Sequence, residues 1–416
     1  MNFHQTQQLL KTILNPFGSA SLVTEDGKLL ASADTQILKS TTSRLVVLQI
    51  IKKYLNPQVG DLFILNDPEN GGLNYQNIFF ITRLTEKLFL VFVKEIDQIN
   101  FKIPPTPLFD KGLKNKTVWP FLVDQNPHAN ILSDFFEKSW NSVHELKSLT
   151  AYLSEIAITK NQVIYFKIVS QILEQNFNTR AIGQNETLAK LTSSESVKLK
   201  LTIDEKQNQR SIHADFSQTS SAGKISAASH IVESALVATI SDIYGMTGFL
   251  SQPVLDLIRL SLPPQSMVSK AHLMGSHNLL LQKIVTEQVT FLLAGLNRKN
   301  KAVPAAFQLS PEFHVELQIE KNYHLISADA KKLVFKDFDY LIKSQKVSPL
   351  MMQQIDGNIK FKFKIETTEN ISVHPKLILH NRNSDFMTIS GASINQEKAT
   401  PLKKNDIVEL NWNLVK

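Results

Sequence analysis

The chain has 416 residues, of which 43% are apolar, and its 45 basic and 38 acidic side chains give a net charge of +7. This composition can bury a sizeable core, either in one large α/β domain or in two or three domains. Cysteine is absent, which excludes disulfides, thiolate metal sites and cysteine nucleophiles. The lysines are scattered, whereas nucleic-acid binders usually gather such charge on one face, so we expect no nucleic-acid partner.

The sequence shows no sign of a membrane segment. It contains no run of about 18 or more apolar residues, so we expect no transmembrane helix. Its first residues, MNFHQT, lack the basic-then-apolar layout of a secretory signal. We therefore expect a cytoplasmic protein.

Residues 1–127 are predicted to form an N-terminal α/β region. Apolar patterns indicate a helix at 4–14, a hairpin of 20–23 and 28–31 around Glu25-Asp26-Gly27, a helix at 45–55, and strands at 62–65, 78–84 and 88–93. Residues 104–127 are rich in proline and have no periodicity, which predicts a long irregular loop. Such loops in compact domains are often functional.

The rest of the chain is predicted as three further regions. Residues 128–195 are predicted to be helical, with two or three helices over 130–176 and a polar linker or surface helical turn over 179–195. Residues 196–303 indicate a central α/β region, with a hairpin of 198–203 and 211–216, helices at 227–244 and 279–296, and a strand at 255–262. Residues 304–416 are predicted to be β-rich, with strands at 359–365, 377–379 and 407–412. The fold class is therefore mixed α/β (α+β).

One motif carries a family resemblance. Residues 60–68 read Gly-Asp-Leu-Phe-Ile-Leu-Asn-Asp-Pro and are followed by Gly71-Gly72. This stretch resembles the signature of the hydantoinase B/oxoprolinase family, in which Gly-Asp-x-Phe-x-x-Asn-Asp-Pro runs into Gly-Gly-Thr-His-x-x-Asp. Further segments resemble the family in the same order, at 25–29, 104–113, 215–217, 282–285 and 402–408. The resemblance covers nearly the whole chain, strongly over 20–125 and weakly over 300–400.

The resemblance implies a class of function. Members of this family are subunits or domains of ATP-dependent ring-opening amidases, such as hydantoinases and oxoprolinases, and of ketone carboxylases. A hydantoinase A-like partner subunit usually binds the ATP, and the B-type subunit carries a divalent metal. The resemblance therefore implies one subunit of a hetero-oligomer that acts on a cyclic amide.

The metal centre implied by the resemblance has lost most of its ligands in this sequence. The positions of the family's His-x-x-Asp are Asn74 and Asn77, and its His-His-Ala-Asp region reads Asp97-Gln98-Ile99-Asn100. The acidic position before the first hairpin falls near Pro16-Phe17, and the histidine-bearing loop after it reads Gln36 to Lys39. Asparagine offers only a neutral oxygen, which is tolerable for calcium but weak for transition metals. Asp97 is the main surviving ligand, so we expect the metal to be weak or lost.

The other candidate residues have structural interpretations beside functional ones. Asp67 is a catalytic candidate together with Asp97, but Asn66-Asp67-Pro68 also fits a turn shaped by side-chain hydrogen bonds, and Asp97 also fits a solvated strand end. His272 and His277 are a weak candidate metal pair. The sequence has neither a Gly-x-Ser-x-Gly elbow nor a Gly-rich phosphate loop. Its 14 glycines are about 3% of the chain, under half the usual share of roughly 7%.

Three hypotheses follow. The first, which we favour, is a subunit with a degenerate metal site that supports a hydantoinase A-like partner. The second is an active cyclic-amide hydrolase subunit whose site is remodelled around Asp67, Asp97 and a neighbouring acid such as Glu69 or Glu95. The third is a stand-alone binding module. We favour the first because scaffold positions persist while the ligand positions have become neutral.

Overall fold

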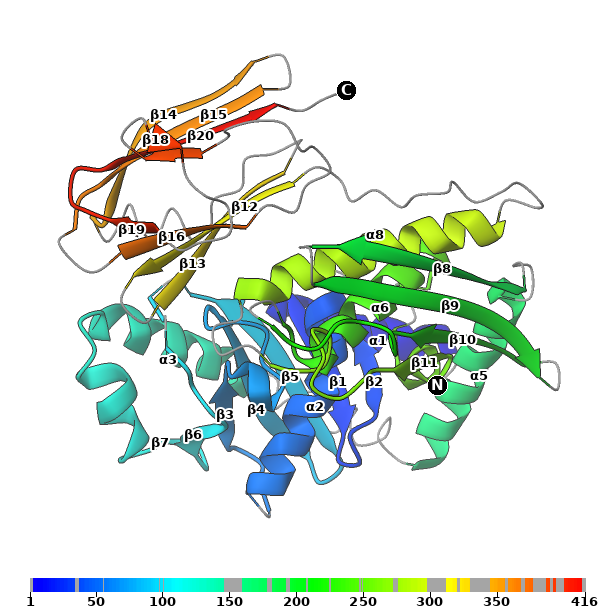
Figure 1. Ribbon diagram of the computed structural model, residues 1–416. Coiled ribbons are helices and arrows are strands. Elements are labelled where there is room, and N and C mark those ends of the chain that lie inside the picture. The colour runs from blue at the N-terminus through cyan, green and yellow to red at the C-terminus, as the bar shows by residue number, and fades with distance from the viewer. Residues whose placement is uncertain are drawn as a thin grey trace. The chain divides into compact units, whose positions relative to one another are not determined.

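The structure is a computed structural model of the chain (Figure 1). It describes residues 3–33, 37–54, 56–96, 98–99, 101–145, 159–177, 182–191, 195–206, 209–223, 226–246, 248, 250–271, 276–297, 312–319, 322–329, 345–355, 358–367, 371–376, 387–389, 392–393 and 400–413. The chain divides into a first compact unit, residues 1–186, 199–218 and 224–303, and a second, residues 187–198, 219–223 and 304–416. Helices and sheets are mixed, so the predicted α+β class is confirmed. The finer four-region division stays a prediction.

The first unit contains a seven-stranded antiparallel sheet in the order β2-β1-β5-β4-β3-β6-β7. The strands are β1 (Ser19–Thr24), β2 (Leu29–Ser32), β3 (Leu62–Leu65), β4 (Asn77–Thr85), β5 (Leu88–Glu95), β6 (Thr106–Asp110) and β7 (Leu113–Lys114). β1, β2 and β3 are buried along their whole length, as are the first six residues of β4 and of β5. An antiparallel sheet often leaves one face in water, so continuous burial means that both faces are covered.

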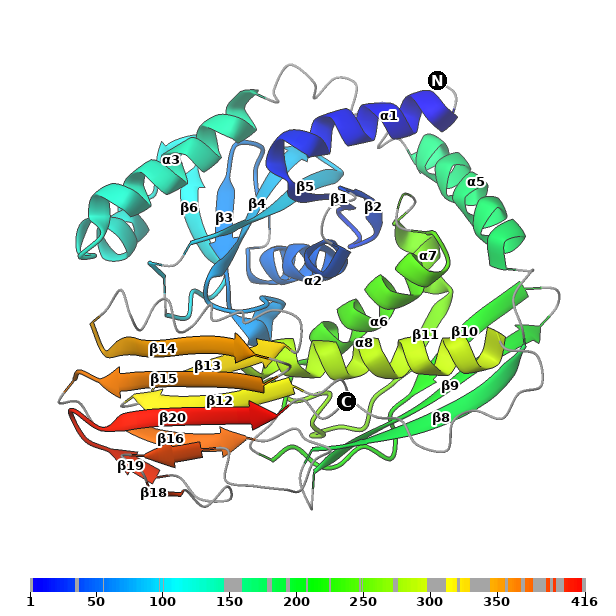
Figure 2. The ribbon, with the colours of Figure 1, turned by 90° about the horizontal axis from the view of Figure 1, so that it is seen from above.

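Helices provide that cover. α1 (Phe3–Leu14) and α3 (Ala129–Glu145) lie on one face of the sheet and α2 (Ile37–Lys53) on the other (Figure 2). On the α3 side, the Phe80 ring stacks on Phe92 with centroids 4.8 Å apart and also meets Phe136 of α3 at 6.0 Å. On the other side, α2 packs against α6 (Ser229–Ile243), which in turn packs against α8 (Ser276–Asn297). The sheet and the helices α2, α6 and α8 surround the turn that follows β3.

Two further helices are α5 (Thr159–Phe177) and α7 (Gln252–Asp256). A four-stranded sheet has the order β11-β10-β9-β8. Its strands are β8 (Gly183–Lys190), β9 (Ser196–Lys206), β10 (Gln209–Asp215) and β11 (Ile258–Ser261). β9 and β10 pair antiparallel, which confirms the predicted hairpin, and β11 pairs parallel to β10.

The second unit is β-rich, as predicted. One sheet has the order β13-β12-β16-β19 and another the order β14-β15-β20-β17-β18. The strands are β12 (Glu312–Ile319), β13 (Asn322–Asp329), β14 (Val347–Ile355), β15 (Asn358–Ile365), β16 (Ile371–Lys376), β17 (Met387–Ile389), β18 (Ala392–Ser393), β19 (Thr400–Leu402) and β20 (Ile407–Asn413). In β15, Phe363 and Ile365 are buried while Lys362 and Lys364 are partly exposed, as the alternating sequence predicts. The strand predicted at 377–379 lies outside the described residues.

Two corrections concern the first unit. The predicted irregular loop at 104–127 contains β6, which pairs along β3, then β7 and the π-helical turn η3 (Pro120–Asp124). The predicted helix at 45–55 begins at Ile37, because Ser40 to Ser43 are buried by tertiary contacts that apolar periodicity does not register. Ile37 to Lys39 are therefore the start of a helix and not a loop.

Two further predictions were wrong or incomplete. The segment predicted as a linker or a surface helical turn at 179–195 forms β8 over residues 183–190. The strand predicted at 255–262 begins only at Ile258, after the short helix α7. In both segments, pairing with a neighbouring strand decides the structure, and local composition does not reveal that pairing.

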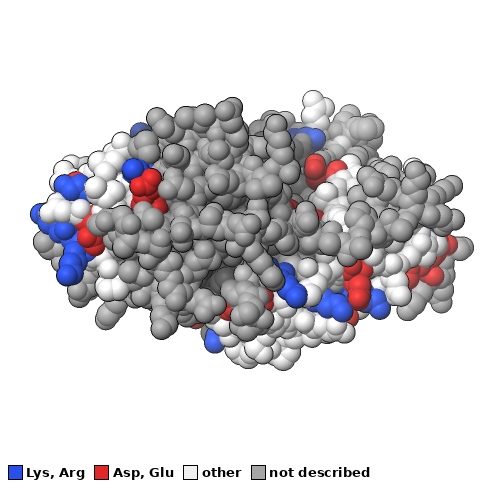
Figure 3. All heavy atoms as spheres, turned by 45° about the horizontal axis from the view of Figure 1, so that its top comes forward, with Lys and Arg blue, Asp and Glu red and all other residues white. Residues whose placement is uncertain are grey.

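The surface and the helices give two further observations. Within the described ranges, no helix is long and apolar enough to cross a lipid bilayer. On the face in Figure 3, the basic and acidic side chains of the described residues lie interspersed. The expectation of no nucleic-acid partner stays a prediction.

Candidate functional site

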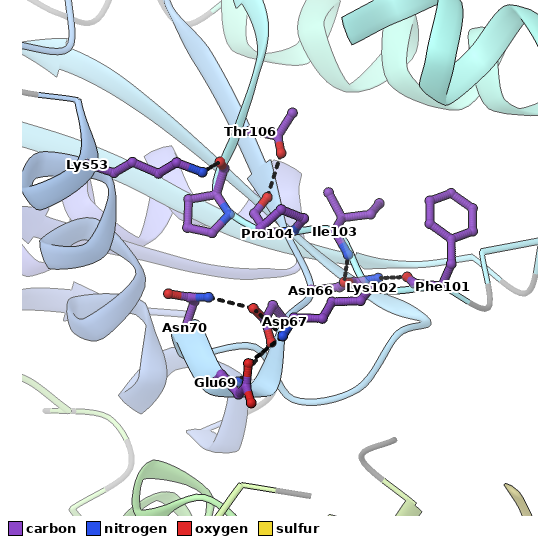
Figure 4. A network of polar contacts seen from close by, with 11 residues as sticks. Lys53, Asn66, Asp67, Glu69, Asn70, Phe101, Lys102, Ile103, Pro104 and Thr106 are labelled. Carbon is purple, nitrogen blue, oxygen red and sulfur yellow. Dashed lines mark hydrogen bonds and ion pairs between the residues drawn. The ribbon is translucent and has the colours of Figure 1, made fainter. Parts of the chain in front are cut away.

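The turn that follows β3 carries the family motif, and Asn66 fixes its geometry. The side chain of Asn66 is fully buried. Its Oδ1 accepts a hydrogen bond from the Ile103 backbone N–H at 2.6 Å, and its Nδ2 donates to the carbonyl oxygens of Tyr75 at 2.8 Å and Phe101 at 2.9 Å. Figure 4 shows Asn66 beside the segment from Phe101 to Ile103. Asn66 therefore ties three segments of the chain together.

Asp67 is buried and holds both the turn and a lysine (Figure 4). Its carboxylate accepts hydrogen bonds from the Glu69 backbone N–H at 2.9 Å and from the Asn70 side chain. Asp67 is thereby the N-cap of the 3-10 turn η2 (Pro68–Asn70). Lys102 Nζ lies 3.2 Å from Asp67 Oδ2 and also contacts the Glu69 carboxylate. Burial on its own lowers the pKa of Lys102, but the hydrogen bonds and charges of Glu69 and Asp67 outweigh it and raise that pKa. Lys102 therefore stays a cation.

Asn74 and Asn77, at the positions implied for His-x-x-Asp, lie together and form a turn. Asn74 Oδ1 accepts hydrogen bonds from the Gln76 N–H at 3.1 Å, the Asn77 N–H at 3.0 Å and Asn77 Nδ2 at 2.7 Å. A carbonyl oxygen has two lone pairs, so three donors leave it no capacity for a metal ion. The pair forms the turn that leads into β4, which begins at Asn77.

Two buried side chains, from α6 and α8, bind the backbone at Gly72 and Leu73, between the turn that follows β3 and the Asn74 turn. His230 Nε2 donates a hydrogen bond to the Gly72 carbonyl oxygen at 2.8 Å, and Asn278 Nδ2 donates to the Leu73 carbonyl oxygen at 2.5 Å. Burial lowers the pKa of His230, although the Gly72 carbonyl and the Asp67 carboxylate oppose that effect. Sequence reasoning did not single out His230, Asn278 or Lys102. Local spacing carries no signal for these contacts, because each joins residues that lie far apart in the sequence.

The other predicted site residues are dispersed or lie outside the described residues. Asp97, Asn100, His272 and Gln36, and the side chain of His277, belong to the latter group. Gln98 is partly buried after β5, and Glu95 is exposed at the end of that strand. Phe17 packs in the core, with its ring centroid 4.8 Å from that of Phe92. The structure thus brings together Asp67, Glu69, Asn74 and Asn77 in one stretch of chain, with Lys102 beside the first two.

The described residues do not fit the divalent metal that the resemblance implies. Asn74 Oδ1 is saturated, and the Asp67 carboxylate already holds an ammonium group. The buried Oδ1 atoms of Asn77 and Asn278 meet no donor within the described ranges, but a hard divalent cation requires about six or more oxygen ligands, with carboxylates among them. No three His, Asp or Glu side chains of the described residues gather closely enough to hold an ion.

Comparison with known proteins gives the fold. No family model matches the chain, and no curated protein matches it. The structure is similar to that of an ATP-dependent caprolactamase from Pseudomonas jessenii, with a TM-score of 0.62 and 10% identity over 98% of this chain and 88% of the caprolactamase chain. It is also similar to an acetone carboxylase in a nucleotide-free structure, with a TM-score of 0.63 and 9% identity over 98% of this chain and 73% of the carboxylase chain. The chain shares the fold of these two enzymes. At such low identity, the likeness shows the fold alone.

The buried His230 predicts a pH dependence of stability. Because burial lowers its pKa, the unfolded chain takes up a proton at a higher pH than the folded chain does. Stability should therefore fall as the pH drops below about 6.5, by at most about 1.4 kcal/mol per pH unit from this group. Urea unfolding between pH 5 and 8 would measure it. We expect His230→Gln, which can still donate to the Gly72 carbonyl, to have a shallower slope than the wild type.

The exposed His128 provides the matched control for this experiment. His128→Gln should keep the wild-type slope, because it replaces a solvent-exposed side chain and leaves the buried imidazole of His230 in place. Equal slopes for the wild type and His230→Gln would contradict the prediction.

Proposed function

We propose that this chain is a hydantoinase B/oxoprolinase-like subunit with a degenerate metal site, and that it acts with a hydantoinase A-like partner that binds ATP. The proposal takes its chemistry from the motif at residues 60–72. It is supported by the fold shared with an ATP-dependent caprolactamase and an acetone carboxylase over 98% of this chain. The substrate class of such a complex would be a cyclic amide.

One observation carries the proposed loss of the metal. Asn74 and Asn77 stand where the resemblance implies two ligands, and they are hydrogen-bonded to each other at 2.7 Å. A histidine and an aspartate there would offer an imidazole nitrogen and a charged oxygen. The asparagine pair instead uses its polar atoms to shape the start of β4. In this proposal, the hydrogen-bonded turn is retained, but its residues no longer bind a divalent metal ion.

Purification from the native host tests the proposal. We expect a tagged chain to recover a stoichiometric partner with the ATP-binding sequence features of a hydantoinase A-type subunit. The isolated chain should contain no stoichiometric transition metal and should not hydrolyse hydantoins, 5-oxoproline or caprolactam, with or without ATP. Metal content by mass spectrometry and amide hydrolysis by chromatography are the two measurements.

Other outcomes would support the alternative hypotheses. A stoichiometric transition metal in the isolated chain that is lost on Asp97→Ala would overturn the degenerate-site proposal in favour of a remodelled active subunit. A stable monomer that recovers no partner would overturn the complex in favour of a stand-alone binding module. The matched control is Asp134→Ala, because Asp134 pairs with Lys138 on the exposed side of α3 and should affect neither result.

A further inference from the structure

We infer that the ammonium group of Lys102 is the cation required by the turn at residues 66–72, which contains Asp67. This turn is therefore held without a metal ion. The inference rests on the proposed function in one respect, that the metal centre is degenerate. Lys102 Nζ lies 3.2 Å from Asp67 Oδ2 and also contacts Glu69 Oε2. The ammonium therefore bridges two carboxylates, one buried and one half-exposed.

The electrostatics of Asp67 explain why a cation is required. The side chain of Asp67 is only 1% exposed, and a buried carboxylate is costly unless it is paired and hydrogen-bonded. Its other contacts, from the Glu69 N–H and the Asn70 amide, are neutral donors. Lys102 brings the full positive charge. Two carboxylates with an amide beside them would otherwise resemble the oxygen ligands that hard divalent cations prefer.

The backbone holds Lys102 in place for this role. Its two neighbours are both bound by Asn66, which donates to the Phe101 carbonyl at 2.9 Å and accepts from the Ile103 N–H at 2.6 Å. Asn66 directly precedes Asp67, so one residue positions both the lysine and its buried partner. The Asp67 N–H also donates to the Ile103 carbonyl at 3.3 Å. The ion pair is therefore part of the hydrogen-bonded frame of the turn.

A lysine in place of a metal changes what the site can do. The ammonium is covalently attached, so a chelator cannot remove it. It also cannot act as a Lewis acid that polarises a carbonyl or lowers the pKa of a bound water. The consequence is a turn that keeps its shape in the presence of chelators but lacks metal chemistry.

Thermal unfolding of the full chain tests the inference. We expect the Tm of the wild type to be unchanged by EDTA or by millimolar Mg²⁺, Ca²⁺ or Mn²⁺. Lys102→Met should lower the Tm by about 3–5 °C, because the buried Asp67 loses its counter-charge. Lys102→Ala should be similarly unstable but should regain part of the loss in millimolar Ca²⁺ or Mg²⁺, since it leaves room for the ion. Lys102→Arg should stay closest to the wild type.

Lys114 provides the matched control. It pairs with Glu137 at 2.5 Å, but both partners are about half exposed, so Lys114→Met should move the Tm by less than about 1 °C. A wild-type Tm that falls in EDTA and recovers with one divalent cation would overturn the inference without any variant. So would a Lys102→Met loss no larger than that of Lys114→Met, or a Lys102→Ala variant that gains nothing from cations. These outcomes depend only on the isolated chain, so they are independent of whether a partner subunit is found.

Discussion

Gly72→Ala is expected to destabilise the chain by about 3 kcal/mol or more, because the added methyl group has no space. A Cβ at this position would lie 2.2 Å from the Asn66 carbonyl oxygen, 2.3 Å from its carbonyl carbon and 2.7 Å from the Asp67 nitrogen. These atoms belong to the backbone, so they cannot move aside as the end of a flexible side chain can. The turn must shift as a whole.

A shift of this turn would break contacts on both of its sides. The Gly72 N–H donates to the Asp67 carbonyl at 2.8 Å, and its carbonyl accepts from His230 at 2.8 Å. Guanidinium unfolding of the variant and the wild type would measure the loss. Gly245→Ala is the control, since Gly245 has φ +66° with nothing within 4 Å of its Cβ position, and it should cost about 1–2 kcal/mol from backbone strain alone. If the two variants lose the same amount, the steric argument is wrong.

Much of the fold was predictable from the sequence because its strands are strongly apolar. The apolar runs that form β4 and β5 are buried over most of their length, so their apolar composition correctly predicts buried strands. The start of α2 was missed for the opposite reason. Ser40 to Ser43 are polar yet buried, and the Thr41 hydroxyl donates to the Ser234 hydroxyl of α6 at 2.6 Å. A helix whose polar residues face another helix has no amphipathic pattern to detect.

The location of the candidate site stays a prediction from the motif, and its contacts could not be predicted from the sequence. The motif drew attention to the turn at residues 66–72, and Asn74 and Asn77 stand at the positions where the resemblance implies ligands. The residues that complete the turn come from distant parts of the chain, because Glu69 and Lys102 are 33 residues apart and Gly72 and His230 are 158 apart. No local spacing encodes such contacts. The four predicted regions and the partner subunit stay predictions.

These contacts sharpen the meaning of a degenerate site. The residues that shape the turn, Asn66, Asp67 and Gly72, each have a steric or hydrogen-bonding reason to be kept. The implied ligand positions, Asn74 and Asn77, serve the local backbone instead. In the proposed function, a turn held by its own hydrogen bonds and by Lys102 needs no ion and serves partner binding alone. The residues that hold the turn are thus different from the residues at the implied ligand positions, so the fold can persist when the metal chemistry is lost.

Asn66→Asp is expected to cost about 4 kcal/mol, although the two side chains have nearly the same shape. The new oxygen would replace Nδ2, which donates to the carbonyl oxygens of Tyr75 and Phe101 in a fully buried position. Two hydrogen bonds become contacts between oxygen atoms, and a buried negative charge is added. Urea unfolding at neutral pH would measure the loss. Asn126→Asp is the control, since the Asn126 side chain accepts an exposed hydrogen bond from the His128 N–H and an aspartate oxygen can do the same.

A second variant, Asn66→Ala, adds no charge and tests whether Asn66 positions Lys102. If Asn66 holds the Phe101–Ile103 segment in place, its loss should also loosen the ion pair between Lys102 and Asp67. Lys102→Met should then cost less in the Asn66→Ala background than in the wild type. The double-mutant cycle should give a coupling of about 1 kcal/mol between the two positions. Additive losses would mean that Lys102 reaches Asp67 without help from Asn66, and that the frame of the turn and its internal cation are independent.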